Sequence, residues 1–245
     1  MSSATALLIS QFLFWLIIIY LLGFIFFTLK FAFKKLRLEE KRRTLFLRYT
    51  LLGIIFWILL LLVISITGFF EDYSSLPPKI AIAALIPIII ILYLLQHRLF
   101  KFVLKVIPEK WLILFQSFRI PMEVMLYMYF LAEIIPYQMT FVGLNHDILV
   151  GVTALIAGYV FFIKRHRQQV AAILWNISGI ALLVNIVSIT VLSTDSPYRI
   201  FMNDPSANFI GSFPFVLIPG FIVPMAIGVH IFSIKQLVMN GTGKE

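Results

Sequence analysis

The sequence predicts an all-α, polytopic membrane protein, a single transmembrane domain over residues 1–245 built as a bundle of seven helices. Hydrophobic residues make up 61% of the chain and charged residues only 13%, whereas about a quarter of the residues in soluble domains are charged. Seven apolar runs are long enough to cross a bilayer, which takes roughly 20 residues in a helix. Seventeen of the 20 Lys and Arg residues lie in alternate gaps between these runs.

The apolar runs define the expected spans. They cover about 5–29, 49–70, 79–97, 111–135, 147–163, 170–193 and 213–235. Each run is continuously apolar, whereas the strands of a transmembrane barrel alternate over about ten residues, so helices are expected. The first run is too long for a cleaved signal peptide and precedes a basic cluster, so we expect it to be retained as a helix.

The basic residues between the runs predict the orientation. The first gap, 30–48, holds eight Lys and Arg residues and is expected in the cytoplasm by the positive-inside rule. Alternation then places 98–110, 164–167 and the tail from Lys235 inside as well. The outer gaps carry the acidic residues Glu71, Asp72, Asp195 and Asp204. We therefore expect the N-terminus outside and the C-terminus in the cytoplasm.

Composition also restricts partners and cofactors. The net charge of +9 follows from the topology, so the lipid bilayer is an expected partner and nucleic acid is not. The absence of cysteine excludes disulfides, thiolate metal sites and a cysteine nucleophile. Retinal is disfavoured because the only lysine of the seventh run is Lys235, at its cytoplasmic edge. No cofactor is expected, and the oligomeric state stays open.

The fourth run carries a polar face, the main candidate for a functional site. At helical spacing, six residues fall within a sector of roughly 120°: Gln116, Arg119, Glu123, Tyr127, Phe130 and Glu133. Ionisable groups are costly inside a membrane, so each is a functional hypothesis. Arg119 and Glu123 either form an internal ion pair or line a cavity, where Arg119 meets an anionic group or Glu123 takes up a proton. Pro121 predicts a bend between them.

Two further candidates come from the sixth and seventh runs. Asn176 and His230 are expected at the inner depth of Arg119, which makes them candidates for ligand binding or proton relay in the same pocket. Hydrogen bonding between helices explains each of them equally well. Pro219 and Pro224 interrupt the seventh run, as in the broken helices that line transporter sites.

Glu133, His146 and Asp147 form a candidate group at the outer face. Their oxygen and imidazole ligands suit a divalent metal. No spacing such as HxxxH supports a metal site, and no metal ligand is assigned. Asn145 or Asp147 can instead cap the first turn of the fifth helix.

Four stretches resemble a known family: FRIPMEVMLY (118–127), TFVGLNHDILVGVTA (140–154), WNISGIALLVNIVSITVLSTDSPYRIF (175–201) and FPFVLIPGFIVPMAIGVHIFSIKQL (213–237). They are similar to a bacterial family of small integral-membrane proteins without an assigned activity. The resemblance covers about half of the chain. It implies a bacterial inner (cytoplasmic) membrane and a seven-helix body, and it implies no activity.

These observations favour a protein that binds a small ligand or a proton in an intramembrane polar pocket, as a transporter or a receptor does. Arg119 and Glu123 are expected at the centre of the pocket, and the polar gap 193–212 over its outer mouth. The alternative is a structural or interaction subunit of a membrane complex whose polar stripe is satisfied internally. An intramembrane metal-dependent enzyme ranks last, because no nucleophile, base and orienting group occur at a recognisable spacing.

Overall fold

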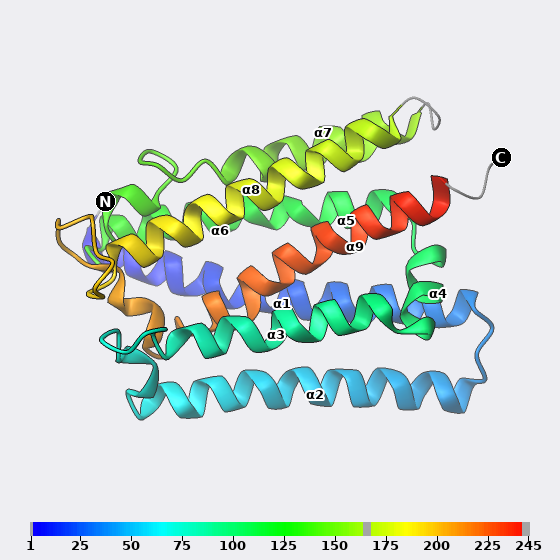
Figure 1. The fold of residues 1–245 in the computed structure, drawn as a ribbon, viewed down its shortest axis with the longest axis horizontal. Helices are drawn as coiled ribbons and strands as arrows, with labels where there is room; N and C mark the ends of the chain where they lie inside the picture. Colours follow the sequence, from blue (N-terminus) through cyan, green and yellow to red (C-terminus); the bar gives the residue numbers. More distant parts are fainter. Residues whose placement is uncertain (1, 164–167, 242–245) are drawn as a thin grey trace.

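The structure, a computed structural model, describes residues 2–163 and 168–241. Within these ranges the chain is helical and forms no strand, which confirms the all-α prediction. Long helices lie side by side, with the N-terminus at one end of the bundle and the C-terminus at the other (Figure 1). The predicted inner gap 164–167 lies outside the described residues.

The helices follow the apolar runs closely. The first two are α1 (Ser3–Lys35) and α2 (Glu40–Ile66). The middle of the chain forms α3 (Ile80–Gln96), α4 (Arg98–Val106), α5 (Glu109–Phe115), the 3₁₀ turn η2 (Gln116–Phe118) and α6 (Arg119–Leu131). The last part forms α7 (Ile148–Ile163), α8 (Gln169–Ser193), the π-helical turn η5 (Ile218–Ile222) and α9 (Val223–Gly241).

Four helices among the described residues are long and apolar enough to cross a membrane: α1, α2, α8 and the continuous rod η5–α9. A fifth span results if α3 and α4, which are bent by 84° relative to each other, count as one broken crossing. The expected set of seven spans is therefore supported only in part. The helices α3 and α7 have 17 and 16 residues, and η2 divides the fourth expected span.

The division of the fourth span has a local cause. Pro121 has no N–H to donate to the carbonyl of Ser117, four residues before it, and the chain tightens into the 3₁₀ turn η2 at this level. The bend predicted from Pro121 thus takes the form of a change in helix type. The segments α5, η2 and α6 still follow one another without a gap.

The outer surface of the helices is apolar. On α2 the side chains of Leu52, Phe56, Leu59 and Val63 are 50%, 67%, 55% and 62% exposed. In water such a stripe would promote association, whereas against acyl chains it is the ordinary solvent-facing surface. The long apolar helices therefore indicate a membrane-associated protein.

Helix α4 was not predicted, because its nine residues lie in an expected gap. It runs across one end of the bundle rather than along it (Figure 1). Val103 and Leu104 are buried while Lys105 is exposed, which gives the helix one apolar and one basic side. Short amphipathic helices of this kind lie in the plane of a membrane interface.

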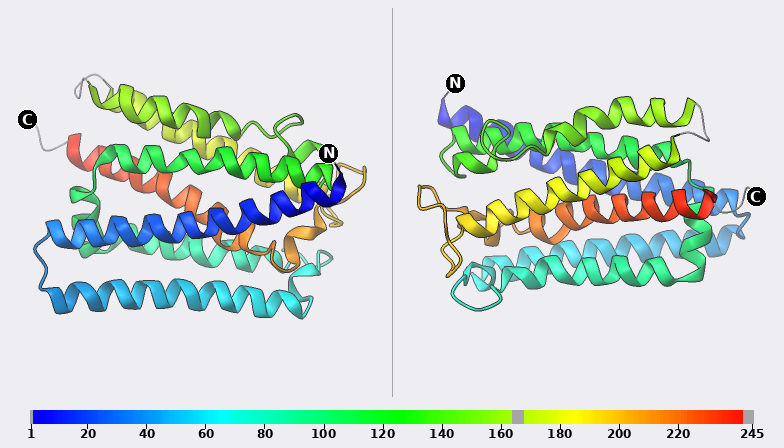
Figure 2. Two further views of the ribbon diagram at one scale, coloured as in Figure 1. Left: turned by 180° about the vertical axis from the view of Figure 1, so that it is seen from behind. Right: turned by 45° about the horizontal axis from the view of Figure 1, so that its top comes forward.

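Lys79 and Arg199 pair with acidic residues of the loops that hold Asp72, Asp195 and Asp204. The Lys79 ammonium lies 2.8 Å from the Asp72 carboxylate, and Arg199 pairs with Asp195 and Asp204. The hydrogen bond from Lys79, together with that from the Ser74 hydroxyl, lowers the pKa of Asp72 to about 2. These loops lie at the end opposite to α4 (Figure 2).

The rod η5–α9 is the centre of the bundle. In its most apolar window 56% of the residues are buried, against 17% for α2. Small residues let neighbouring helices approach it closely. A Cβ at Gly228 would lie 2.8 Å from Ile91 of α3, and a Cβ at Gly220 would lie 2.5 Å from Leu61 of α2.

Helix α2 is also held to the rod by a hydrogen bond. Pro224 has no N–H to donate to the Gly220 carbonyl four residues earlier. The Trp57 indole N–H of α2 donates to that carbonyl at 2.9 Å. A polar group that proline leaves exposed inside the membrane thus becomes a contact between helices.

We expect Trp57→Phe to lower the free energy of unfolding by about 1 kcal/mol, because the ring is kept and one hydrogen bond is lost. Trp15→Phe is the control, since Trp15 is 42% exposed, and should change stability by less than about 0.5 kcal/mol. Unfolding in mixed micelles of sodium dodecyl sulfate and a mild detergent measures both. Equal losses in the two variants would contradict the assigned role of Trp57.

Candidate functional site

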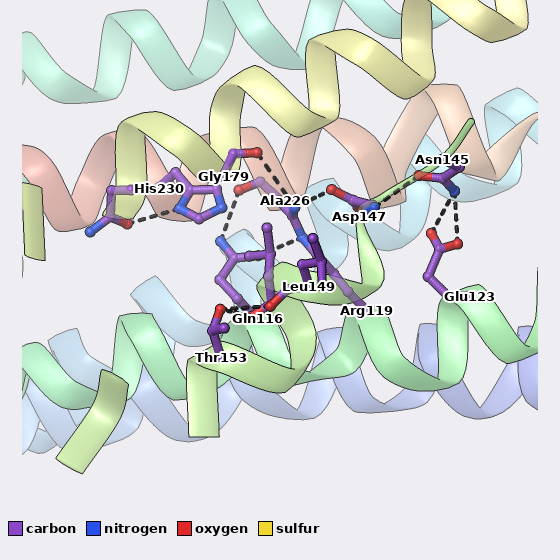
Figure 3. Close-up of polar contacts among 12 residues, drawn as sticks. Gln116, Arg119, Glu123, Asn145, Asp147, Leu149, Thr153, Gly179, Ala226 and His230 are labelled. Atoms are coloured by element: carbon purple, nitrogen blue, oxygen red, sulfur yellow. Dashed lines mark hydrogen bonds and ion pairs between the residues drawn. The ribbon is translucent and has the colours of Figure 1, made fainter. Parts of the chain in front are cut away.

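A buried ion pair joins α6 to the residue that precedes α7. Nη1 of Arg119 donates to Oδ1 of Asp147 at 2.5 Å, and the two residues are only 1% and 4% exposed (Figure 3). Nε of Arg119 donates to Oε1 of Gln116 at 3.2 Å, and Nη1 also reaches the Gly179 carbonyl of α8 at 3.5 Å. The pair therefore ties α6, α7 and α8 together at one point.

Gln116 holds Arg119 in place from the preceding turn. Its side chain is fully buried, and its Nε2 donates to the Ala226 carbonyl of α9 at 3.1 Å. That bond orients Oε1 toward the guanidinium (Figure 3). The guanidinium is thus connected to α9 as well.

A second carboxylate, Glu123, lies one helical turn further along α6 and is 1% exposed. Both of its oxygens accept from Nδ2 of Asn145, at 2.8 and 2.7 Å. Oδ1 of Asn145 accepts the backbone N–H of Asp147 at 3.1 Å. One amide side chain therefore connects Glu123 to the backbone of Asp147, the residue whose carboxylate binds Arg119 (Figure 3).

One of the two sequence hypotheses paired Arg119 with Glu123, four residues away on the same helix. The structure does not show this pair. Arg119 pairs instead with Asp147, 28 residues later. The physical reason is the course of segment 132–147, which folds back toward α6 and brings Asn145 and Asp147 into the core. Asn145 then supplies the donor for Glu123, and the guanidinium is left to neutralise Asp147.

These three groups also line a cavity of about 390 Å³ between α3, α6, α8 and η5–α9. Its walls are otherwise almost entirely apolar, with side chains such as Ile80, Met122, Leu126, Leu183 and Ile222. The second sequence hypothesis, that Arg119 and Glu123 face a cavity, describes this arrangement.

Residues of the loops before α3 and after α8 close one end of the cavity. Thr194, Tyr198 and Phe209 line it, as expected for the gap 193–212. Tyr73 lines it too, and its hydroxyl donates to the Asn208 carbonyl at 2.7 Å. Burial raises the pKa of the Tyr73 phenol, so it keeps the proton that it donates.

His230 and Asn176 meet in a separate buried cluster between α9 and α8. Nδ1 of His230 lies 2.8 Å from Oδ1 of Asn176, whose Nδ2 donates to the Ala172 carbonyl and to Ser233. Because Oδ1 can only accept, Nδ1 carries the proton and Nε2 is an acceptor. Both residues are fully buried, and neither lines the cavity.

Gly179 separates this cluster from Arg119. Its carbonyl accepts from Arg119, while a Cβ at this position would lie 2.4 Å from Cε1 and Nε2 of His230. Only a glycine lets the imidazole pack against α8 here. The two polar groups are therefore neighbours across one residue (Figure 3).

The remaining candidates lie elsewhere. Tyr127 is half-buried and packs on Phe130 and Phe141, with ring centroids 6.2 and 5.1 Å away. Glu133, which follows the end of α6, and His146 are exposed, whereas Asp147 is buried against Arg119. The outer-face group is thus not brought together. In the described ranges, no three His, Cys, Asp or Glu side chains are placed to hold a metal.

Sequence reasoning missed the importance of Asn145 and Gly179. The sequence suggested Asn145 only as a helix cap. Its position two residues before Asp147 is the signal that its side chain can accept the Asp147 backbone N–H, while its amide group stays free to donate to Glu123. Gly179 follows Asn176 by three residues, which places both on one face of α8.

Comparison with known proteins gives one match. The family model described as "Domain of unknown function (DUF8737)" matches residues 79–238. The match extends from α3 into α9 and includes Arg119, Glu123, Asp147 and their polar partners, while α1 and α2 lie before it. No curated protein and no solved structure matches the chain.

We expect Asp147→Ala to lower the free energy of unfolding by about 3–5 kcal/mol, because it leaves a buried guanidinium without its counter-charge. Glu123→Gln should stay within about 1 kcal/mol of the wild type, since the amide can still accept from Asn145 and a buried charge is removed. Denaturation in mixed micelles measures both. A larger loss for Glu123→Gln than for Asp147→Ala would reverse the assignment of the ion pair.

Gly179→Ala should cost about 1–3 kcal/mol because the new methyl group overlaps the His230 ring. In a His230→Ala background the same change should cost less, with a coupling of about 1 kcal/mol or more. A double-mutant cycle on unfolding free energies checks this. Additive effects would show that the imidazole does not press on Gly179.

Proposed function

Because this chain belongs to the DUF8737 family, whose model spans the helices around the cavity, we propose that the family feature is an intramembrane binding site. In this proposal the chain is an integral membrane protein that binds a small ligand or a proton beside Arg119, Glu123 and Asp147. The observation that carries it is the presence of three buried ionisable residues, each less than 5% exposed, on the wall of an otherwise apolar cavity. Such groups are costly in a membrane interior and mark functional positions.

The proposal includes seven crossings of a bacterial inner membrane, with the N-terminus outside. The placing of the two termini at opposite ends supports it, because that requires an odd number of crossings (Figure 1). The continuous segment α5–η2–α6 covers 109–131, which is long enough for a span. The basic helix α4 lies at the end that holds the turn between α1 and α2 (Figure 1).

The connection through Asn145 supports a transporter-like or receptor-like role. A group bound by Glu123 competes with Asn145 for the carboxylate oxygens. Movement of Asn145 changes its bond to the Asp147 backbone, next to the ion pair with Arg119. Occupancy of the cavity can thereby alter how α6 and α7 are held together, which is what a ligand-driven shift between two states requires.

A structural or interaction subunit is the second candidate, and the internal pairing favours it. Arg119 pairs with Asp147, and His230 bonds to Asn176, within the chain. In that case Arg119→Ala lowers stability or assembly and changes no ligand response. No observation favours an enzyme.

The absence of cysteine allows a direct test of access to the cavity. Ala81 of α3 lines the cavity, whereas the next residue, Ile82, is 46% exposed and lies outside it. In native membranes we expect N-ethylmaleimide to label Ala81→Cys roughly tenfold faster than Ile82→Cys, because a thiol in hydrocarbon stays protonated and unreactive. Equal rates, or no labelling of Ala81→Cys, would mean that the cavity admits no small molecule.

A further inference from the structure

We propose that the ligand is a lipophilic monovalent cation, an apolar body with one ammonium-like or phosphonium-like charge, and that Glu123 is its counter-charge. This inference rests on the proposed function, because it needs the cavity to bind a small molecule. It names the chemical class that the walls and their charge select.

The charges on the wall do not balance. Arg119 and Asp147 neutralise one another at 2.5 Å. Glu123 accepts only from Asn145, an uncharged donor, and makes no ion pair within the described part of the chain. The lining residues therefore carry one unmatched negative charge when all three are ionised. A bound monocation removes that excess, whereas a bound anion would add a second unmatched charge in surroundings of low dielectric constant.

The walls select an apolar body. The volume of the cavity, about 390 Å³, falls in the range of roughly 300–1,000 Å³ for small-molecule pockets. Sugars, amino acids and nucleotides present several polar groups, and each would need a partner that these walls lack. The one further donor is Nη2 of Arg119, which has no hydrogen-bond partner among residues 2–163 and 168–241. It is free to bind a single hydroxyl, ether or carbonyl oxygen on the same ligand.

The rim of the cavity indicates entry from the lipid. Leu85 of α3 is 51% exposed, and Val187 and Val191 of α8 are each 40% exposed, yet all three line the cavity. The cavity is therefore reached sideways between α3 and α8, which both pack on α9. Lipophilic cations accumulate in bilayers, so this route delivers them to Glu123.

A proton and the cation compete for the same carboxylate. The charged groups that face Glu123 are Arg119 on α6 and Asp147 before α7, and they neutralise each other. Protonation of Glu123 leaves the cavity without net charge, and the cation then loses its attraction. Binding of the cation should consequently strengthen as the pH rises.

Tetraphenylphosphonium and tetraphenylborate test the proposal, because they have the same shape and opposite charges. Equilibrium binding to the purified full chain in a mild detergent should show saturable binding of the phosphonium and not of the borate. Glu123→Gln should weaken phosphonium binding by roughly tenfold or more, as expected for loss of a buried charge partner. Glu123→Asp, which keeps the charge, should retain most of it, and the exposed Glu133→Gln is the matched control. Wild-type binding should tighten from about pH 6 to about pH 9.

Three results would overturn the inference: tighter binding of the borate, undiminished phosphonium binding by a folded Glu123→Gln variant, or binding that does not depend on pH. Failure of both ions to bind, with Ala81→Cys still labelled, would overturn the inference and leave the proposed function standing. Failure of both ions together with an unlabelled Ala81→Cys would remove both proposals.

Discussion

The need to neutralise one buried guanidinium organises the membrane interior of this protein. Arginine keeps its charge at any accessible pH, so a buried Arg119 requires a fixed counter-charge. Asp147 supplies it, and it can do so only because segment 132–147 turns back into the bundle and α7 begins at the depth of Arg119. This contact holds α6 to α7, the bond from Arg119 to the Gly179 carbonyl holds α6 to α8, and the missing side chain of Gly179 lets His230 of α9 pack against α8.

Local patterns predicted the helices but not their partners. Continuous apolar runs predicted α1, α2, α8 and α9, but only α8 agrees to within one residue at both ends. Helices α1 and α2 extend well beyond the expected spans, and α9 begins and ends later than the seventh run. The helical face predicted for the fourth span correctly grouped Gln116, Arg119 and Glu123. The periodicity of a helix predicts which side chains share a face, but it does not predict which other segment packs against that face. The pairing of Arg119 with Asp147 depends on the path of a loop, which has no periodic signal, so it was missed.

The polar residues of the interior divide into two kinds of contact. His230, Asn176 and Gln116 are held by hydrogen bonds between helices and do not line the cavity. Glu123 keeps more capacity to accept bonds than its one neighbour uses. The family match includes α6 to α9 and the apolar wall from α3, so most of the cavity lies within the matched residues, while Tyr73 and Pro78 of its lining precede them. Helix α1 lies outside the match although it packs along α6.

The length of α1 and α2 has a mechanical consequence. With 33 and 27 residues, they measure about 50 and 40 Å at 1.5 Å per residue, whereas the hydrocarbon layer is about 30 Å thick. The extra length of the two helices places the Lys- and Arg-rich turn between them beyond the hydrocarbon layer, where water solvates its charges and lipid phosphates attract them. The anchored turn sets the vertical position of the bundle, and a thicker or thinner bilayer must tilt the helices rather than slide them. The thickness of the host membrane is thus expected to set the tilt of α1 and α2, the two longest of these helices.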